Sequence, residues 1–470
     1  MERLAKVAVV FSLIQAFAGS VSSQPAKDEV TSLPGLTGPL SSKQYAGYLQ
    51  ASGTIQLHYW FVESQGNPAE DPVLLWLSGG PSCSSIDAYL TELGPYWVNS
   101  DGKTLSANDY SWTKVANIIF LESPAGVGYS YAGSPDYTTN DDKTAENNYL
   151  ALLDFFKKFP QMVKNDFYLT GESYAGIYIP TLAVKLMENK APINFKGFAI
   201  GNGLLDLKLL AATSYEYEYY HGIIGEELWN KLQVSCCSKG SCHYIGSKNP
   251  QCIQAQQEAH YFLNNVGINP YDVTGDCTGS YSKDVNSFSM LSLLGFDALW
   301  PLSGFLFSLK QTNTSGSPGL HSSFLPCIDT SKVESYVNMP QVRTALHVPN
   351  FVTQKWTVCN PPLAANYTKQ YTSMLDQFKA LLPKYRSLVY NGDADDICNF
   401  LGDQKFVTSL GQPEVGKRRP WMYKGQVAGF VKEYKQVTFM TVKNSGHMVP
   451  AITPGPALQM ISNFLKEKPQ

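Results

Sequence analysis

A serine in a short turn is the first residue of this sequence that could do covalent chemistry. Ser173 lies in the stretch Gly171-Glu172-Ser173-Tyr174-Ala175, between an apolar run of strand length and the expected start of a helix. A strand–turn–helix of this kind exposes the serine hydroxyl above the sheet edge and points the helix N-terminus at it. The strict pattern is G-x-S-x-G, and alanine is small enough to replace the last glycine. Ser173 is therefore a candidate nucleophile, with an ordinary glycine-rich turn as the alternative.

A base and an acid for this serine can be sought at the ends of other expected strands. Among the seven histidines, His447 directly follows an apolar strand, and Asp393 and Asp395 follow another. The order Ser173, then Asp393 or Asp395, then His447 is that of the α/β-hydrolases. Three strand-end loops in this order indicate a nucleophile, an acid and a base.

The aspartates Asp393, Asp395 and Asp396 also resemble, superficially, a calcium-binding loop. No glycine or glutamate follows them at the spacing of an EF-hand. We therefore expect no metal at this loop, and the proposed chemistry needs no cofactor.

Two backbone amides could stabilise the charge that develops on a substrate carbonyl oxygen. One belongs to Tyr174, directly after the serine, and the other lies in the turn Gly79-Gly80-Pro81. Glycines there allow the backbone to approach a substrate closely. We expect these two amides to form an oxyanion hole.

A sheet whose strands end at one edge would position all of these residues. Apolar runs of strand length alternate with stretches of helical spacing, and several of the runs end in a glycine-containing loop. The expected strands cover residues 44–49, 56–61, 73–77, 117–121, 167–170, 195–200, 387–390 and 437–442, and the later expected helices include 367–382 and 455–465. The pattern predicts an α/β-hydrolase fold with a mostly parallel sheet and its site at the C-terminal edge of the strands.

The alternation of expected strands and helices stops after residue 204, where helix-like stretches alternate with closely spaced cysteines. We interpret this part as a helical, disulfide-bearing cap inserted into the core. The predicted division is a signal peptide at 1–23, core at 24–204, cap at 205–326 and core at 327–470. Residues 288–309 are markedly apolar, but Asp297 and Pro301 interrupt them, which favours a lid over a membrane helix.

The N-terminus is typical of a secretory signal peptide. Arg3 and Lys6 precede an apolar run at 7–17, and small residues follow, so we expect cleavage between Ala18 and Ser23. The run is shorter than the roughly 20 residues of a membrane span, which disfavours the alternative of an anchor helix. The sequons at Asn313 and Asn366 agree with the secretory route.

Composition excludes some classes of protein and favours an oxidising compartment. The chain has 470 residues, 44% of them hydrophobic, and a net charge of -3, so it can bury a large core and gives no sign of binding nucleic acid. Nine cysteines suit a secreted protein. The adjacent pair Cys236-Cys237 does not match zinc-ligand spacing, so four disulfides and one thiol are expected, with the pairing open.

Several stretches spread over the mature chain resemble the serine carboxypeptidase family (peptidase family S10). They are WLSGGPSCSS (76–85), TELGP (91–95), ESPAGVGYSY (122–131), LTGESYAGIYIP (169–180), AIGNGLLD (199–206), YYHGIIGEELW (219–229), VRTALHVP (342–349), VYNGDADDICNFLGD (389–403) and SGHMVP (445–450). The resemblance implies a serine-type carboxypeptidase acting on peptides and proteins. It implies Ser173, Asp395 and His447 as the triad and the amides of Gly80 and Tyr174 as the oxyanion hole.

The same resemblance implies that Ser78, Glu92 and Glu172 recognise the free carboxylate of the substrate. Two glutamates beside a carboxylate would repel it if both were ionised, whereas a protonated pair can donate a hydrogen bond. An acidic pH optimum is therefore expected. The family usually has Asn-Gly-Gly-Pro-Gly where this chain has Ser78-Gly79-Gly80-Pro81-Ser82. Ser78 offers a shorter donor, and Ser82 would be strained if its φ is positive.

The resemblance also implies how the cysteines pair, where in the cell the protein is located and which partners it can have. The implied disulfides are Cys83–Cys359, Cys236–Cys252, Cys237–Cys242 and Cys277–Cys327, with Cys398 free. The implied location is the secretory pathway, in lysosomes or outside the cell, for a protein that does not span the membrane and can form a homodimer. Two alternatives to the peptidase are an acyltransferase or esterase with the same triad, and a non-catalytic partner that protects other lysosomal hydrolases in a complex.

Overall fold

The structure is a computed structural model that describes residues 25–134, 137–239, 241–265, 267–277, 325 and 327–468. The expected signal peptide, Asn313 and the apolar stretch 288–309 lie outside the described residues. Within the described part, no helix is both long and apolar enough to cross a membrane.

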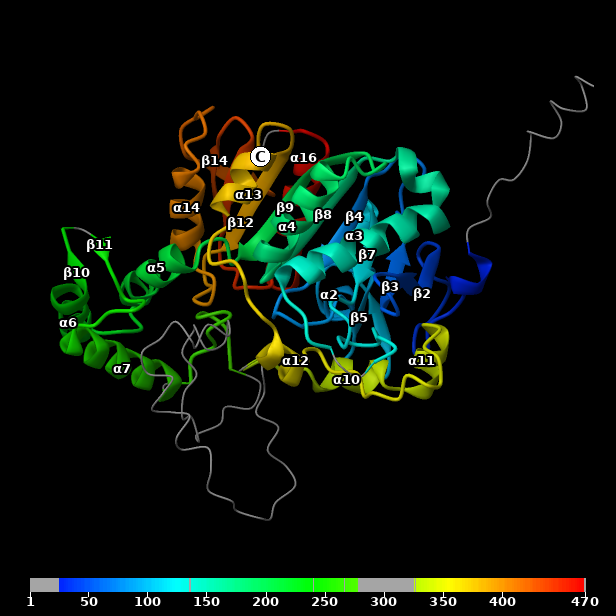
Figure 1. The fold of residues 1–470 in the computed structure, drawn as a ribbon, viewed down its shortest axis with the longest axis horizontal. Helices are drawn as coiled ribbons and strands as arrows, with labels where there is room; N and C mark the ends of the chain where they lie inside the picture. The colour runs from blue at the N-terminus through cyan, green and yellow to red at the C-terminus, as the bar shows by residue number, and fades with distance from the viewer. Residues whose placement is uncertain are drawn as a thin grey trace, which may run out of the picture.

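One large sheet runs through the core (Figure 1). In spatial order its strands are β1 (Glu29–Val30), β2 (Gln44–Gln50), β3 (Gln56–Val62), β7 (Asn117–Leu121), β4 (Val73–Leu77), β8 (Phe167–Ser173), β9 (Phe195–Gly203), β12 (Arg386–Gly392), β15 (Val437–Val442), β14 (Gln426–Glu433) and β13 (Arg419–Tyr423). The six strands from β7 to β15 are parallel, and antiparallel strands extend the sheet on both sides. The predicted parallel centre is therefore present, and its strands end at one edge.

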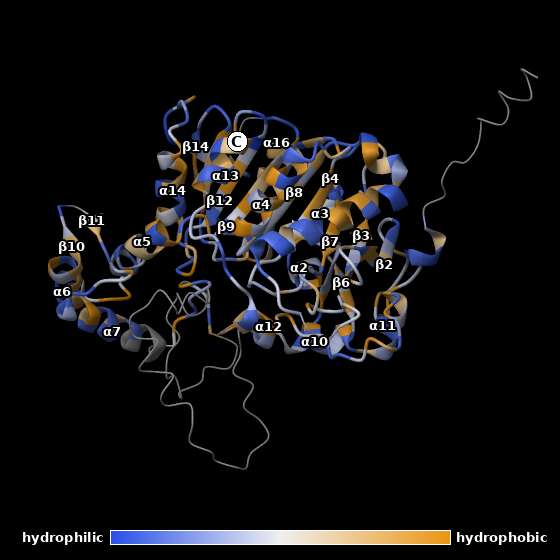
Figure 2. Ribbon diagram, viewed as in Figure 1, coloured by the Kyte–Doolittle hydropathy of each residue, from blue (hydrophilic) through white to orange (hydrophobic). Residues whose placement is uncertain are grey.

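The central strands are apolar on both faces because helices cover both sides. In β4, Leu75 packs into one core cluster and Trp76 into the other, and all five residues of the strand are buried. Figure 2 shows hydrophobic residues along β4 and β8 and more polar residues on the outer faces of the helices. Such continuous apolar runs are typical of a covered parallel sheet.

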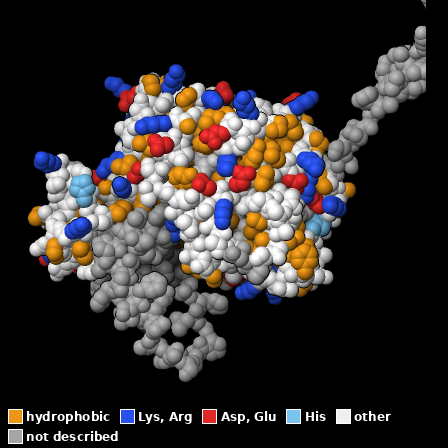
Figure 3. Space-filling view, viewed as in Figure 1, with side chains coloured by type: hydrophobic (Ala, Val, Ile, Leu, Met, Phe, Trp, Pro, Cys, Tyr) orange, Lys and Arg blue, Asp and Glu red, His pale blue; other side chains and the backbone are white. Residues whose placement is uncertain are grey.

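Two groups of helices cover the two faces. One core cluster contains residues of α3 (Asp141–Lys158), α4 (Ala175–Glu188), α13 (Leu375–Leu381) and α14 (Phe400–Ser409). The other contains residues of α2 (Ser85–Thr91), α10 (Ser331–Val337), α11 (Pro340–Ala345), α15 (Val449–Ile452) and α16 (Pro454–Leu465). Short elements complete the core: α12 (Pro361–Asn366), the hairpin β5 (Tyr96–Val98) and β6 (Leu105–Ala107), and the 3-10 turns η1 (Ala26–Asp28), η2 (Trp112–Lys114) and η3 (Pro160–Lys164). On the face in Figure 3, acidic and basic side chains are interspersed over this core.

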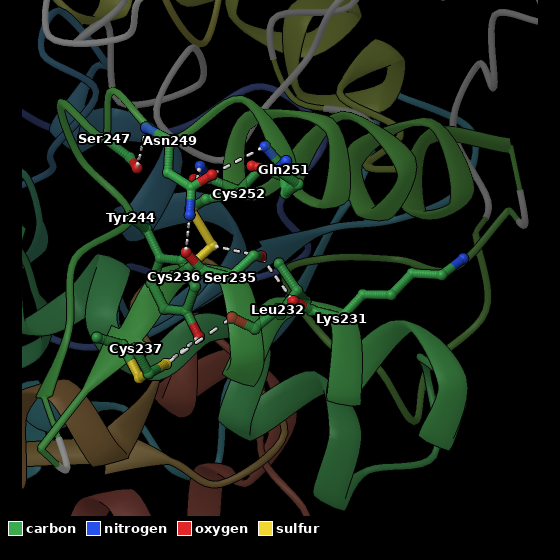
Figure 4. The surroundings of a disulfide bond; sticks show 12 residues. Lys231, Leu232, Ser235, Cys236, Cys237, Tyr244, Ser247, Asn249, Gln251 and Cys252 are labelled. Atoms are coloured by element: carbon green, nitrogen blue, oxygen red, sulfur yellow. Dashed lines mark hydrogen bonds between the residues drawn. A yellow bond between two sulfur atoms is a disulfide. The ribbon is translucent and has the colours of Figure 1, made fainter.

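A smaller lobe of helices extends from the end of the sheet beyond α14 (Figure 1). It comprises α5 (Leu207–Tyr220), α6 (Glu226–Cys236), the hairpin β10 (Cys237–Ser238) and β11 (Ser241–Cys242), and α7 (Pro250–Asn265). It has its own apolar cluster, and the disulfide Cys236–Cys252 joins α6 to α7 (Figure 4). The division of the chain at residues 204 and 326 remains a proposal.

Two local predictions were wrong. The helix expected over 367–382 begins only at Leu375, as α13, because the preceding residues Thr368 and Ser373 pair instead with Asn140 and Asp206 through isolated bridges. Strands β13 and β14, the last two at one end of the sheet, were not predicted, because they are partly exposed and lack a continuous apolar run.

Candidate active site

Ser173 stands at the end of a central strand and directly before a helix. It is the last residue of β8, and α4 begins at Ala175. Its φ is +63°, a left-handed conformation that L-residues adopt only where the surroundings impose it. The backbone oxygen of Ser173 accepts a hydrogen bond from Leu204 N at 2.9 Å, which ties the turn to the end of β9. This is the geometry of a nucleophile elbow.

His447 and Asp395 meet at the same sheet edge. They follow the neighbouring parallel strands β15 and β12, and His447 Nδ1 lies 2.8 Å from Asp395 Oδ2. Both side chains are buried. An ionised Asp395 would hold the imidazole proton on Nδ1 and leave Nε2 as the acceptor, the tautomer that a general base requires. His447 and Ser173 line one cavity.

The sequence pattern left open whether Asp393 or Asp395 is the acid that orients the histidine, and the structure distinguishes them. Asp393 Oδ1 accepts from Asn444 N at 2.8 Å, so this carboxylate fixes the loop before the histidine. Asp395 instead accepts from His447 and from the amides of Ile397, at 3.0 Å, and Cys398, at 3.2 Å. Asp395 is thus the carboxylate placed to orient the imidazole.

Sequence reasoning missed a residue that fixes this carboxylate. Asn202 Nδ2 donates to Asp395 Oδ2 at 2.8 Å, and Asn202 Oδ1 accepts from Gly392 N at 3.0 Å. Asn202 adopts φ +42°, which asparagine tolerates better than most residues. The signal was present, since Gly201-Asn202-Gly203 follows an expected strand, but its partner lies far away in the sequence.

The Gly79-Gly80 turn lies against the nucleophile. A Cβ atom on Gly79 would fall 2.4 Å from Tyr174 N and 2.7 Å from Ser173 Cβ, a separation that real atoms do not reach. Gly80 has φ +111°, where a side chain is strongly disfavoured. The backbone therefore approaches the serine turn as closely as an oxyanion hole requires, with the amides of Gly80 and Tyr174 as the candidate donors.

Of the three residues expected to recognise a carboxylate, two line the same cavity and the third is buried beside them. Ser78 and Glu172 line it, and Glu92 is buried beside Glu172. Burial raises the pKa of both glutamates, and the charges of Glu92 and Asp87 raise the pKa of Glu172 further. Ser78 Oγ accepts from Trp76 Nε1 at 3.2 Å, so its own proton can be donated to another acceptor.

Asp87 is a second residue that the sequence pattern did not reveal. It lies in α2 and lines the cavity beside Ser78 and Glu172. Burial raises the pKa of Asp87 to about 7, Lys332 opposes that shift and Glu334 adds to it. The cavity therefore has an acidic wall beyond the pair of glutamates.

Four disulfides are present among the described cysteines, with the pairings that the resemblance implied. Cys83 and Cys359 line the cavity, so their disulfide forms part of its wall. Cys398 is buried and unpaired, and it is absent from the residues that line this cavity. Asn366 is exposed at the end of α12.

Comparisons with known proteins agree with this geometry. The family model described as serine carboxypeptidase matches residues 34–467. The chain is 42% identical to the lysosomal protective protein of Mus musculus, with 97% of each chain covered. It is 37% identical to a serine carboxypeptidase of Caenorhabditis elegans, ctsa-4.1, with 98% of each covered.

A solved structure shares the fold. The prohormone-processing carboxypeptidase KEX1(delta)p of Saccharomyces cerevisiae superposes with a TM-score of 0.71 at 23% identity, covering 94% of this chain and 96% of the other. The predicted α/β-hydrolase fold is thereby confirmed. The chain belongs to the serine carboxypeptidase family.

Proposed function

We propose that this protein is a carboxypeptidase that releases single residues from the C-termini of peptides and proteins through an acyl-enzyme. The observation that carries the proposal is the buried pair Glu92 and Glu172 beside the cavity of Ser173 and His447. A generic esterase needs the triad alone, whereas recognition of a free C-terminal carboxylate needs donors beyond it.

The chemistry follows from the positions of the triad. Ser173 Oγ attacks the carbonyl carbon of the last peptide bond, and its proton passes to His447 Nε2. Asp395 stabilises the imidazolium, and the amides of Gly80 and Tyr174 stabilise the oxyanion. His447 then protonates the departing amine, which leaves as the free amino acid. A water molecule gives a proton to His447 and attacks the ester carbonyl carbon. The bond to Ser173 Oγ then breaks, His447 returns the proton to that oxygen, and the shortened peptide leaves.

Recognition of the carboxylate makes the reaction depend on pH. Because burial raises the pKa of both glutamates and the charge of Asp87 raises both further, the pair retains a proton under mildly acidic conditions. In that state Glu172 can donate a hydrogen bond to the substrate carboxylate. Once both are ionised they repel it, so we expect an acidic optimum for peptide acids.

The test combines covalent labelling with matched substrates. A fluorophosphonate should label the wild type and not Ser173→Ala, and a peptide with a free C-terminus should compete better than its C-terminal amide. Equal competition by acid and amide would contradict the carboxypeptidase proposal. Faster acyl transfer to an added alcohol than to water would favour the acyltransferase alternative.

We place the protein in the secretory pathway, in lysosomes or outside the cell. Four disulfides suit an oxidising compartment, and the similarity to a lysosomal protein supports the lysosome. A protective role beside other hydrolases is separable from catalysis, since Ser173→Ala would abolish the peptidase and leave a protective complex intact.

A further inference from the structure

A second pair of buried carboxyl groups lies behind the triad, where the proposed mechanism makes no use of it. Glu218 is in the last turn of α5, and Asp396 directly follows Asp395. Their side chains are only 2% and 7% exposed. Among the described residues, Glu218 Oε2 and Asp396 Oδ1 have no hydrogen-bond partner. Such groups are costly to bury as anions, so the pair calls for an explanation.

The pair lies where the smaller lobe joins the core. Helix α5 leads from β9 into α6 and α7 (Figure 1). Thr213 Oγ1 of α5 donates to Asn399 Oδ1, at the N-terminus of α14, at 3.0 Å. One residue before Glu218, Tyr217 OH donates to Asp393 O at 2.9 Å. The end of α5 is therefore attached directly to the loop that carries Asp395.

Asp396 belongs to the turn that holds the triad aspartate. The two amides that follow it, of Ile397 and Cys398, donate to the Asp395 carboxylate. The amide of Asp396 itself donates to Pro270 O at 3.1 Å, and in the same segment Tyr271 O accepts from His447 N at 2.7 Å. A displacement of Asp396 would thus disturb both partners of the His447–Asp395 contact.

Acidic and phenolic groups dominate the surroundings of the pair. The described titratable groups around it are Tyr215 and Tyr217 of α5, His221 directly after α5, Asp393 and Asp395 of the loop, Tyr244 and His260 of the lobe, and Tyr271 and Asp272 of the segment after α7. His221 faces Asp393, and His260 lies against Tyr215 OH, where burial lowers its pKa to about 4. The pKa of Glu218 is raised mainly by burial and further by the charge of Asp396. The pKa of Asp396 is raised mainly by burial and further by the charge of Asp395.

We propose that Glu218 and Asp396 are positioning residues for the triad: while both carboxyl groups are neutral, α5 stays docked on the loop of Asp395, and ionisation of the two groups drives α5 and the loop apart. The inference rests on the proposed function, since it assumes that Asp395 orients His447. The direction follows from the raised pKa values. The folded protein keeps protons that the unfolded chain has lost above about pH 4, so attachment of α5 weakens as pH rises.

The experiment measures the rate of fluorophosphonate labelling of Ser173 from about pH 5 to about pH 9. This probe carries no carboxylate, so it does not depend on recognition by Glu92 and Glu172. The variants are Glu218→Gln and Asp396→Asn, which keep a neutral hydrogen-bonding group, and the control is Glu216→Gln on the same helix. Glu216 is partly exposed and pairs with Lys405 Nζ at 3.3 Å.

We expect the labelling rate of the wild type to decrease at alkaline pH. In Glu218→Gln and Asp396→Asn the decrease should begin at least about one pH unit higher, so that at the same alkaline pH these variants are labelled about tenfold faster than the wild type. The control should follow the wild type. Profiles of both variants that coincide with that of the wild type would overturn the proposal, and so would failure of both variants to fold at acidic pH, because the neutral pair is the proposed working state. Absence of labelling in the wild type at every pH would instead contradict the proposed function.

Discussion

Asn202 and His447 contact the same oxygen of Asp395, each at 2.8 Å. The carboxylate is fully buried, and its other oxygen accepts from the amide of Ile397. The role proposed for Asp395, that of a triad aspartate, requires it both to orient the imidazole and to stabilise its charged form. Here the asparagine of one strand end fixes the aspartate of the next, so the orientation of the base depends on two parallel strands.

Removing the Asn202 amide should therefore lower kcat without changing KM. We expect Asn202→Gly to reduce kcat by about tenfold or more, since a buried carboxylate would lose about 1.5–3 kcal/mol of hydrogen bonding. Asn202→Ala should lose the same activity and, in addition, about 1 kcal/mol of stability, because alanine disfavours φ +42°. Steady-state kinetics and thermal unfolding separate the two effects. An unchanged kcat in both variants would contradict the orienting role.

The pH dependence of KM should show whether Glu92 and Glu172 recognise the carboxylate of the substrate. With a raised pKa, Glu92 and Glu172 are protonated at acidic pH, and KM for peptide acids should rise as the pH increases through the titration of the pair. Glu172→Gln replaces the titrating donor by a permanent one, so its KM should change much less, where the wild type changes about tenfold per pH unit above the pKa of the pair. The matched C-terminal amide is the control substrate, and its KM should follow the same course in both proteins. A KM profile of Glu172→Gln identical to that of the wild type on the peptide acid would exclude this glutamate from recognition.

The central strands and the loops after them could be predicted from local sequence, because a doubly covered strand must be apolar throughout. The bounds of β4, β7 and β15 match the expected runs. Local pattern does not reveal partners that only the topology brings together. Asn202 meets Asp395 across 193 residues, and Glu218 meets its acidic neighbours through the docking of α5. The strands β13 and β14 were not predicted for a related reason, since a half-exposed strand has no continuous apolar run.

Substitutions of Ser82 should separate the cost of its positive φ from the contribution of its hydrogen bond to stability. Ser82 has φ +83°, and its hydroxyl donates to Asn360 O at 2.9 Å. Ser82→Ala should lose the hydrogen bond and keep the strain, which lowers the free energy of unfolding by about 1 kcal/mol. Ser82→Gly also loses the bond but relieves the strain, so it should be more stable than the alanine variant by about 1 kcal/mol. Chemical denaturation measures both. Equal stability of the two variants would show that the positive φ carries no cost here.

Cys398 should resist chemical modification in the folded protein. Burial first, and then the charges of Asp395, Asp403 and Glu172, raise the pKa of its thiol well above the usual range. The thiolate is the reactive form, so iodoacetamide at neutral pH should leave Cys398 unmodified until the protein is unfolded. Because Cys398 does not line the cavity, a small mercurial should inhibit only as fast as the protein opens. Mass spectrometry of the modified peptide, with Cys398→Ala as the control for labelling elsewhere, measures this, and rapid modification of the native protein would mean that the site behind Asp395 is open to solvent.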